Sequence, residues 1–228
     1  LVPIKLAYSR EWTCKEAFLL TLEKSARDVD LAAANARLTI LSETDTLTGL
    51  GNRRSANAQL QAGWVDACAD STWATLMLID IDAFKRLNDT AGHPEGDRCL
   101  RRVAQSLAAA AFRHGAQVAR YGGEEFVAFL PGAAPSEAAE IGESLRLAVQ
   151  DLTYSHPGLP EGGCVTVSIG VATAHGSLGS LDIAAADLLK VADDALYRAK
   201  RGGRNRVECA TLVPTSANSD GVRTSAFG

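Results

Sequence analysis

The sequence predicts an α/β chain, an α+β sandwich in which helices flank a central mixed, mostly antiparallel sheet. Three observations predict this class. Apolar runs of strand length alternate with longer amphipathic segments of helical period. A Gly-Gly turn joins two of the runs, as is typical of an antiparallel hairpin. A hydrophobic content of 46% and a charged content of 22% belong to a chain that packs a core.

The first 44 residues lack the strand pattern. Residues 1–14 show no pattern that assigns them. Residues 15–44 contain neither proline nor glycine, and Phe18, Leu22 and Val29 recur at steps that suit one apolar helical stripe. We expect a helical stalk here and interpret it as a parallel coiled coil that leads into the main domain. A single amphipathic helix packed on its own domain is the alternative.

The main domain is expected over residues 45–209. The predicted order is a helix at 52–69, a strand at 73–81, a short helix from about 83, a helix at 93–113, strands at 118–121 and 125–130, a helix at 136–151, a strand at 165–174, a helix at 184–200 and a short strand at 206–209. The run 73–81 (WATLMLIDI) is apolar almost throughout, as expected of a buried strand. Residues 210–228 are rich in Ser, Thr, Gly and Asn, and we expect a disordered tail there.

Charge and cysteine usage limit the function classes. A formal net charge of −4 does not suit a groove for polymeric nucleic acid, whereas a small nucleotide with its own metal ions is compatible with it. The five cysteines are odd in number and have no metal or redox spacing, which favours reduced thiols of a cytoplasmic protein.

No apolar run approaches the roughly 20 residues that span a bilayer, and there is no signal peptide. Because the chain begins at Leu1, we expect a fragment whose upstream sensor domain is missing. A membrane tether in that missing part, at the inner membrane, is compatible with this expectation.

The strand at 73–81 ends in acidic residues. Asp80 and Asp82 lie on the same side of an extended chain, and buried carboxylates are costly unless they are paired. A carboxylate beside a backbone carbonyl suits a hard cation such as Mg²⁺, and an Asp before a helix suits an N-cap. We assign Asp80 to metal binding and Asp82 mainly to capping the helix that starts near Ala83.

The predicted hairpin turn carries two more carboxylates, Glu124 and Glu125, after Gly122 and Gly123. The glycines allow a bulky ligand to approach the backbone. Adjacent like charges repel unless a cation lies between them and a further carboxylate. If the hairpin pairs beside the strand at 73–81, Glu124 meets Asp80 across one metal ion. A solvated acidic turn is the alternative.

Cations and base-reading side chains complete the set of candidates. Lys200 and Arg204 flank a helix end at two glycines, where they suit a terminal phosphate group or simply the helix C-terminus. Lys85 is a further candidate phosphate ligand. Asn88 and Asp97 suit a base, because an Asp accepts from the N1 and N2 donors of guanine and adenine offers no such pair.

Four ordered blocks of the sequence resemble the GGDEF family of diguanylate cyclases. The resemblance covers about residues 45–207, and the blocks are residues 45–54 (DTLTGLGNRR), 80–97 (DIDAFKRLNDTAGHPEGD), 120–126 (RYGGEEF) and 195–205 (ALYRAKRGGRN). The signature reads GGEEF here. The resemblance implies a palm-like nucleotidyl cyclase fold and the condensation of two GTP into cyclic di-GMP across a homodimer.

The resemblance also implies a role for each matched residue. Asp80, the Ile81 carbonyl and Glu124 are expected to bind two Mg²⁺ ions, for which Mn²⁺ substitutes. Glu125 assists the second ion or deprotonates the attacking hydroxyl. The remaining matched residues are expected to bind GTP. Guanine is expected to contact Asn88 and Asp97, and the β- and γ-phosphates the Phe84–Lys85 stretch, Lys200 and Arg204. Gly122 and Gly123 are expected to leave room for the nucleotide.

One departure concerns the inhibitory RxxD motif of many members. The corresponding window is residues 113–116, where Arg113 is present and Ala116 replaces the Asp. We therefore predict weak or absent product feedback at this site. Asp45 and Arg120 are expected to pair and to brace the N-terminal segment against the hairpin.

Three other functions compete with an active cyclase. A domain without turnover that senses GTP or cyclic di-GMP is disfavoured by the intact Asp80, Glu124, Glu125 and Lys200. A cyclase with a mixed dinucleotide product is disfavoured by Asp97. A structural dimerisation module leaves the carboxylates unexplained.

Overall fold

The structure is a computed structural model that describes residues 24, 27, 43–160, 163–181, 183–213 and 223–226. The predicted stalk lies almost wholly outside the described residues, so its coiled coil stays a prediction. Contacts divide the chain into one unit at Leu1–Glu43 and another at Thr44–Gly228. The second unit carries the sheet and the candidate site, and it is described by itself.

The elements predicted from the sequence are present with ends shifted by a few residues, and two elements that were not predicted, a 3-10 helix and a last short strand, are added. In chain order, all the elements are α2 (Arg53–Asp70), β1 (Trp73–Ile81), α3 (Phe84–Ala91), α4 (His93–Phe112), β2 (Gln117–Arg120), β3 (Glu125–Pro131), α5 (Pro135–Gln150), β4 (Val167–His175), the 3-10 helix η1 (Gly176–Leu181), α6 (Ala185–Arg201), β5 (Val207–Val213) and β6 (Arg223–Ala226).

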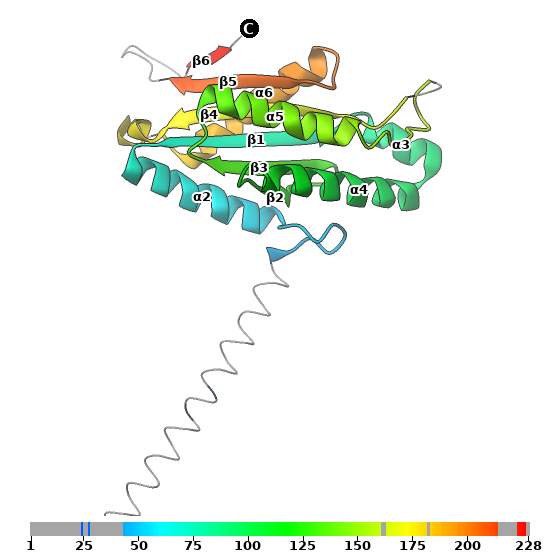
Figure 1. Ribbon diagram of the computed structural model, residues 1–228, viewed down its shortest axis with the longest axis horizontal. Coiled ribbons are helices and arrows are strands. Elements are labelled where there is room, and N and C mark those ends of the chain that lie inside the picture. Colours follow the sequence, from blue (N-terminus) through cyan, green and yellow to red (C-terminus); the bar gives the residue numbers. More distant parts are fainter. Residues whose placement is uncertain are drawn as a thin grey trace, which may run out of the picture. The chain divides into compact units, whose positions relative to one another are not determined.

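The strands form one sheet in the order β2-β3-β1-β4-β5-β6, with β1 inside it (Figure 1). Among these six strands, β4 and β5 pair in parallel and the other neighbouring strands are antiparallel. The mixed, mostly antiparallel sheet that the sequence predicts is therefore confirmed, and so is the β2–β3 hairpin.

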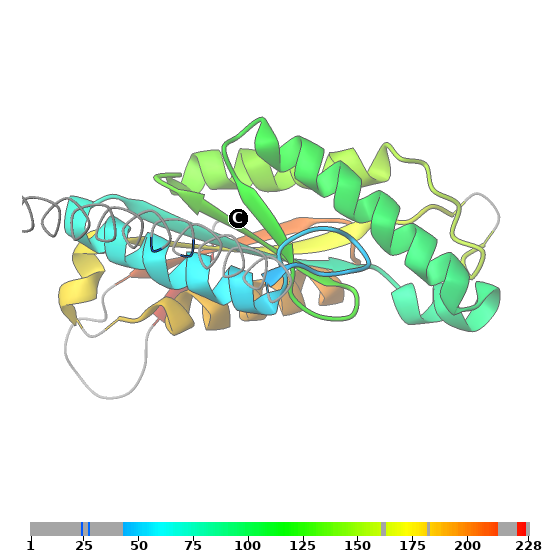
Figure 2. The same ribbon diagram turned by 90° about the horizontal axis from the view of Figure 1, so that it is seen from below.

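Helices cover both faces of the sheet. Figures 1 and 2 show α4 and α5 on one face and α2 and α6 on the other. Because side chains of a strand alternate between faces, Met77, Ile79 and Ile81 of β1 enter one core, whereas Leu76 and Leu78 enter the second. Two-sided burial explains why the sequence of β1 is apolar without alternation.

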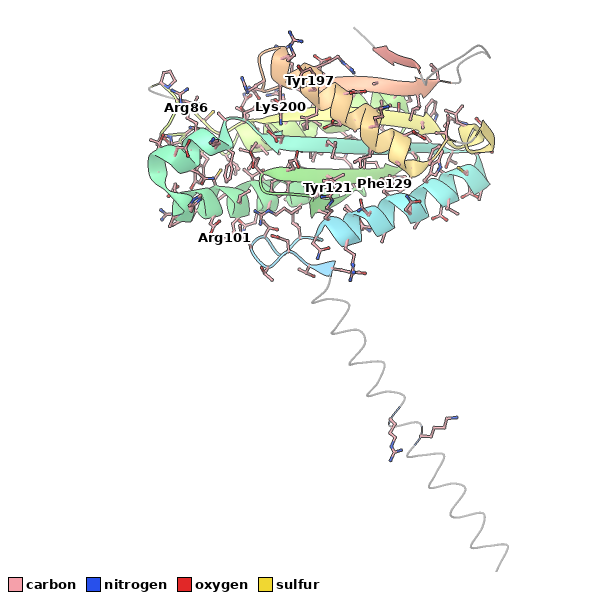
Figure 3. The ribbon with its side chains drawn as sticks, turned by 180° about the vertical axis from the view of Figure 1, so that it is seen from behind. Arg86, Arg101, Tyr121, Phe129, Tyr197 and Lys200 are labelled. Atoms are coloured by element: carbon pink, nitrogen blue, oxygen red, sulfur yellow. The ribbon has the colours of Figure 1, made fainter. Side chains whose placement is uncertain are left out.

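A glycine sets how closely α6 approaches the sheet. A Cβ on Gly170 of β4 would lie 2.2 Å from the Ala192 oxygen and 2.2 Å from the Leu196 nitrogen, both backbone atoms of α6. Any other residue would push the helix away. This contact fixes the distance of α6 from the sheet. Lys200 lies in the last turn of that helix, where Figure 3 labels it.

The C-terminal end of the domain differs from the prediction. Residues 210–213, assigned above to a disordered tail, continue β5. Their side chains alternate between the two faces of the sheet and are buried on both. Ala210 and Leu212 pack in one core, while the Thr211 hydroxyl lies 2.8 Å from that of Thr173. Composition alone hid this alternation. Residues 223–226 add β6 beside β5, and the rest of the predicted tail lies outside the described residues.

Within the part of the chain that the structure describes, no helix has both the length and the apolar character needed to cross a bilayer.

Candidate active site

The candidate site begins where β1 and the β2–β3 hairpin end together. Asp80 of β1 is paired with Glu125 of β3 in the antiparallel register. The backbone N–H of Ile81 donates to the Glu124 carbonyl over 3.3 Å. The hairpin turn therefore lies beside the end of β1, and the acidic residues of two adjacent strands gather at one edge.

Asp80 is a buried carboxyl group, 7% exposed, and it pairs with Lys200, whose Nζ lies 2.8 Å from Oδ2. Burial raises the pKa of Asp80 to about 6. Lys200 opposes this shift through its hydrogen bond and its charge, while the charges of Glu124 and Glu125 add to it. The group is thus surrounded by more negative charge than one lysine offsets, which favours a further cation.

The donor set fits a metal ion that arrives with a ligand. Among the described residues, no three Asp, Glu, His or Cys side chains form a cluster that would cage an ion. Mg²⁺ is commonly held by one or two carboxylates, with waters and substrate phosphates completing its shell. Two carboxylates, Asp80 and Glu124, and one backbone carbonyl, that of Ile81, come from neighbouring strand ends. This donor set fits such a mode of binding.

A half-buried arginine holds the hairpin turn in place. Arg120 donates to the Gly123 carbonyl through Nε (3.2 Å) and Nη2 (2.7 Å), and its Nη1 lies 3.2 Å from both carboxylate oxygens of Asp45. Asp45 also accepts from the Thr48 hydroxyl over 2.7 Å. The predicted Asp45–Arg120 pair is confirmed, and it ties the segment before α2 to the turn that carries Glu124.

Asp82 does not cap α3, so that prediction was wrong. The N-cap residue is Ala83, which has a left-handed backbone (φ 56°) and no side-chain cap. The Asp82 carboxylate instead accepts from the hydroxyls of Thr166 and Ser168 and from the Asn205 N–H. These three donors come from distant parts of the chain and outcompete the local helix end.

The α3–α4 corner carries the predicted base-reading residues. Asn88 has a buried Oδ1 without a hydrogen-bond partner, which is costly unless a ligand supplies a donor. A Cβ on Gly96 of α4 would lie 1.9 Å from this oxygen, so glycine leaves Asn88 its place. Asp97 follows directly and is half-buried. The structure thus brings both residues to one corner.

The predicted phosphate ligands lie at two helix ends. The Phe84 side chain is buried in the core, so only its backbone remains available at the start of α3, and the neighbouring Lys85 is exposed. Arg204 lies past the end of α6 with an exposed side chain, and its N–H donates to the Ala199 carbonyl over 3.1 Å. As predicted, α6 ends at the glycine pair.

Comparison with known proteins identifies the family. The profile described as "Diguanylate cyclase, GGDEF domain" matches residues 42–206. The chain belongs to the GGDEF family.

Similar proteins of this family are known as sequences and as structures. The diguanylate cyclase DgcM of Escherichia coli K12 is 43% identical over 166 residues, which are 73% of this chain and 38% of DgcM. The coiled coil and GGDEF domain of DgcB from Caulobacter crescentus, solved with c-di-GMP, superimposes with a TM-score of 0.71 at 33% identity over 82% of this chain and 96% of that one. The active GGEEF domain of a diguanylate cyclase from Vibrio cholerae superimposes with a TM-score of 0.58 at 31% identity, over 72% of this chain and 98% of that one. The chain thus spans well under half the length of the curated relative.

Arg113, which the sequence matched to the arginine of the inhibitory RxxD motif, lines a surface pocket of about 620 Å³ with the acidic side chains of Glu140, Glu143 and Asp151. Ala116 is buried against the core. Glu143 is paired with Arg146, which leaves Glu140 and Asp151 as the carboxylates that face the single arginine among the lining residues. Such a surface does not favour an anionic dinucleotide.

Sequence reasoning missed residues that support the site of this GGDEF domain. His156 is buried, its Nε2 lies 3.2 Å from the Ala83 carbonyl, and its Nδ1 accepts the Gly158 N–H over 3.2 Å. Asn205 and Arg146 bond to each other near Asp82. No spacing in the sequence marks these contacts, although Asn205 lies inside a matched block.

Proposed function

We propose that the chain is a diguanylate cyclase that condenses two GTP into cyclic di-GMP and releases two pyrophosphates. The family and the names of its relatives support this activity. The observation that carries it is the acidic edge formed by Asp80 and the Glu124–Glu125 turn, with Lys200 against Asp80. In each half-reaction the 3′-hydroxyl of one GTP attacks the α-phosphate of the other.

Diguanylate cyclases of this family depend on a metal ion. We propose two ions per site, Mg²⁺ with Mn²⁺ as substitute, held by Asp80, the Ile81 carbonyl and Glu124. Such ions lower the pKa of the attacking hydroxyl and offset charge on the phosphates. Glu125 is the register partner of Asp80, which supports the proposal that it accepts the hydroxyl proton or contacts the second ion.

Guanine selection is assigned to the α3–α4 corner. The unpartnered Asn88 oxygen would accept one amino hydrogen of the base. The Asp97 carboxylate would accept from N1 and N2 of guanine, a pair of donors that adenine lacks. This assignment disfavours ATP as a substrate and a mixed dinucleotide as the product.

The triphosphate is assigned to the two helix ends. No side chain caps α3, so N–H groups at its start, in the Phe84–Lys85 stretch, are available to phosphate oxygens. Lys200 pairs with Asp80 over 2.8 Å. With a cation at Asp80 the lysine would be free to bind the β- and γ-phosphates together with Arg204. A Cβ on Gly123 would meet nothing within 4 Å, which indicates open space for the nucleotide at the turn.

Two copies of the domain are needed because one site holds one GTP. We propose a homodimer in which the two sites face each other, so that each hydroxyl is held at the partner's α-phosphate. The stalk predicted at 15–44 would hold the pair together, and an upstream sensor domain would adjust it. The free thiols at Cys68, Cys99, Cys164 and Cys209 fit a reducing cytoplasm.

The decisive experiment is incubation of the chain with GTP and Mg²⁺ followed by nucleotide chromatography. We expect cyclic di-GMP and pyrophosphate in a 1:2 ratio from the wild type, and none from Asp80→Asn or Glu124→Gln. Asp66→Asn, an exposed acid on α2, is the matched control and should keep activity. Labelled ATP in parallel tests for a mixed product. GTP binding without turnover would replace this proposal with the sensor function.

A further inference from the structure

The loop after α6 has an unusual backbone. Gly203, Arg204 and Asn205 are three consecutive residues with positive φ, at 117°, 65° and 47°. Two of the three are not glycine. Such conformations are costly for side-chain-bearing residues and persist only where the surrounding contacts determine them. The contacts that hold this loop therefore decide where Arg204 stands.

The first set of contacts joins the loop to Asp82. The Asn205 N–H donates to Asp82 Oδ2 over 3.0 Å. The same carboxylate accepts from the Thr166 hydroxyl over 2.7 Å and from the Ser168 hydroxyl over 2.6 Å. Asp82 is 6% exposed and follows Asp80 by two residues on the same chain segment. The loop is thus tied to the end of β1.

The second set joins the Asn205 side chain to α5. Its Oδ1 accepts from Arg146 Nη1 over 2.6 Å, and its Nδ2 donates to Gln150 Oε1 over 2.9 Å. Arg146 is itself buried and is held by Glu143 through two bonds, Nε to Oε2 at 2.9 Å and Nη2 to Oε1 at 2.6 Å. Both ends of the Asn205 amide are therefore fixed by a rigid helix.

We propose that Asp82, Asn205 and Arg146 form a positioning cluster that holds Arg204 at a fixed place relative to Asp80. The distance between the phosphate-binding arginine and the acidic end of β1 is thereby kept constant. The inference rests on the proposed function, in which Arg204 binds the β- and γ-phosphates. None of the three touches a reacting atom, so they act through Arg204. The cluster sets the affinity for the pyrophosphate part of the substrate.

Two substitutions separate positioning from mere stability. Asn205→Gly keeps the positive φ and the N–H to Asp82 but removes both amide contacts. Arg146→Met keeps the length of the side chain and removes its donors. The matched controls are Arg101→Met, on the exposed surface of α4 (Figure 3), and Asn57→Gly, which weakens α2 at an exposed position. We expect the KM for GTP and the inhibition constant of pyrophosphate to rise about tenfold in both cluster variants, as for the loss of one hydrogen bond.

A double-mutant cycle gives the sharper readout. Arg204→Ala alone should raise the pyrophosphate inhibition constant, and adding Asn205→Gly to it should add nothing, because the cluster acts through Arg204. Full additivity of the two substitutions would overturn the inference. So would cluster variants that lose only melting temperature or kcat while KM and the pyrophosphate constant match those of the controls.

Pyrophosphate binding by calorimetry keeps the test independent of turnover. If the wild type binds pyrophosphate and Asn205→Gly weakens that binding, the inference stands even where no cyclic di-GMP is formed and the proposed function fails. If the wild type makes cyclic di-GMP and pyrophosphate binds equally to both proteins, the inference fails and the function stands. Asn205→Gly carries the test where Arg146→Met does not fold.

Discussion

At the scale of single residues, the ionised form of Asp80 lowers the stability of the fold. Burial raises the pKa of Asp80 from 3.8 to about 6, so ionising the group is harder in the folded chain than in the unfolded one. An acid with a raised pKa contributes its stability at pH values below 3.8 and loses that contribution as the pH rises through 6. The ionised site is therefore a weak point of the metal-free fold.

This cost predicts a pH-dependent gain from Asp80→Asn. In EDTA, the variant should melt above the wild type at pH 8, by about 2–4 °C for each kcal/mol recovered. The difference should shrink at pH 5, where the wild-type carboxyl group is protonated. Thermal unfolding by circular dichroism at both pH values measures it. Equal differences at pH 5 and pH 8 would contradict a raised pKa.

His156 supports the residue after Asp82 through one defined tautomer. Its Nδ1 accepts the Gly158 N–H, so Nε2 carries the hydrogen that it donates to the Ala83 carbonyl. His156→Leu leaves that carbonyl without its donor and should lower the free energy of unfolding by about 1–3 kcal/mol. His156→Gln keeps an amide donor and should recover part of the loss.

Urea unfolding of the two variants measures this effect, with His114→Leu as the control at an exposed position. A His156→Leu variant as stable as the control would show that the Ala83 contact contributes nothing.

At the scale of elements, the sequence predicts correctly those helices and strands whose form is determined by a local pattern of residues. The strand β1 was predicted over its observed bounds because both of its faces are buried, which leaves a continuous apolar run. The Asp82 cap was wrong because an Asp before a helix looks the same whether or not distant hydroxyls compete for it. Thr166 and Ser168 lie more than 80 positions away, where no local pattern reports them.

The packing of α3 against α4 predicts a specific effect of Gly96→Ala. The new Cβ would meet Asn88 Oδ1 at 1.9 Å and must displace the side chain assigned to guanine. We expect the KM for GTP to rise about tenfold or more, since a polar contact to the base is lost. Steady-state kinetics at saturating Mg²⁺ measures it.

Gly63→Ala in α2 is the matched control for this change. Its Cβ would meet the ring of Phe129 at 2.1 Å, an overpacking of similar severity between α2 and β3 (Figure 3). Both variants should lose melting temperature, and only Gly96→Ala should change KM. A parallel rise of KM in both would assign the effect to general destabilisation.

At the scale of the whole molecule, the candidate site divides into two kinds of residue. The acids of β1 and the hairpin, with Lys200, were found from motif blocks, and the fold brings them to one edge. The Asp45–Arg120 pair was also predicted. The supporting contacts of Arg146 and His156 were not, because they join α5 and the loop before β4 to the site through tertiary packing alone.

The pocket around Arg113 predicts an enzyme without product feedback at that position. Ala116 supplies no carboxylate, and three acids line the pocket with the arginine. Cyclic di-GMP added at the concentration of GTP should leave the initial rate unchanged, in the wild type and in Arg113→Ala alike. Tight product binding that Arg113→Ala abolishes would refute this prediction.

A reaction that needs two facing domains makes the rate depend on assembly. If each domain holds one GTP, as proposed, an inactive copy should inhibit an active one by pairing with it. Titrating the wild type with excess Asp80→Asn should lower the rate toward zero as mixed dimers replace active ones.

The predicted stalk gives this experiment its control. Asp80→Asn lacking residues 1–44 should poison far less if that segment holds the pair together, because it then cannot compete for wild-type partners. Equal poisoning by the long and the short variant would assign pairing to the domain at Thr44–Gly228 itself. A rate that neither variant lowers would mean that both GTP molecules react within one copy, and the facing-site arrangement would fall.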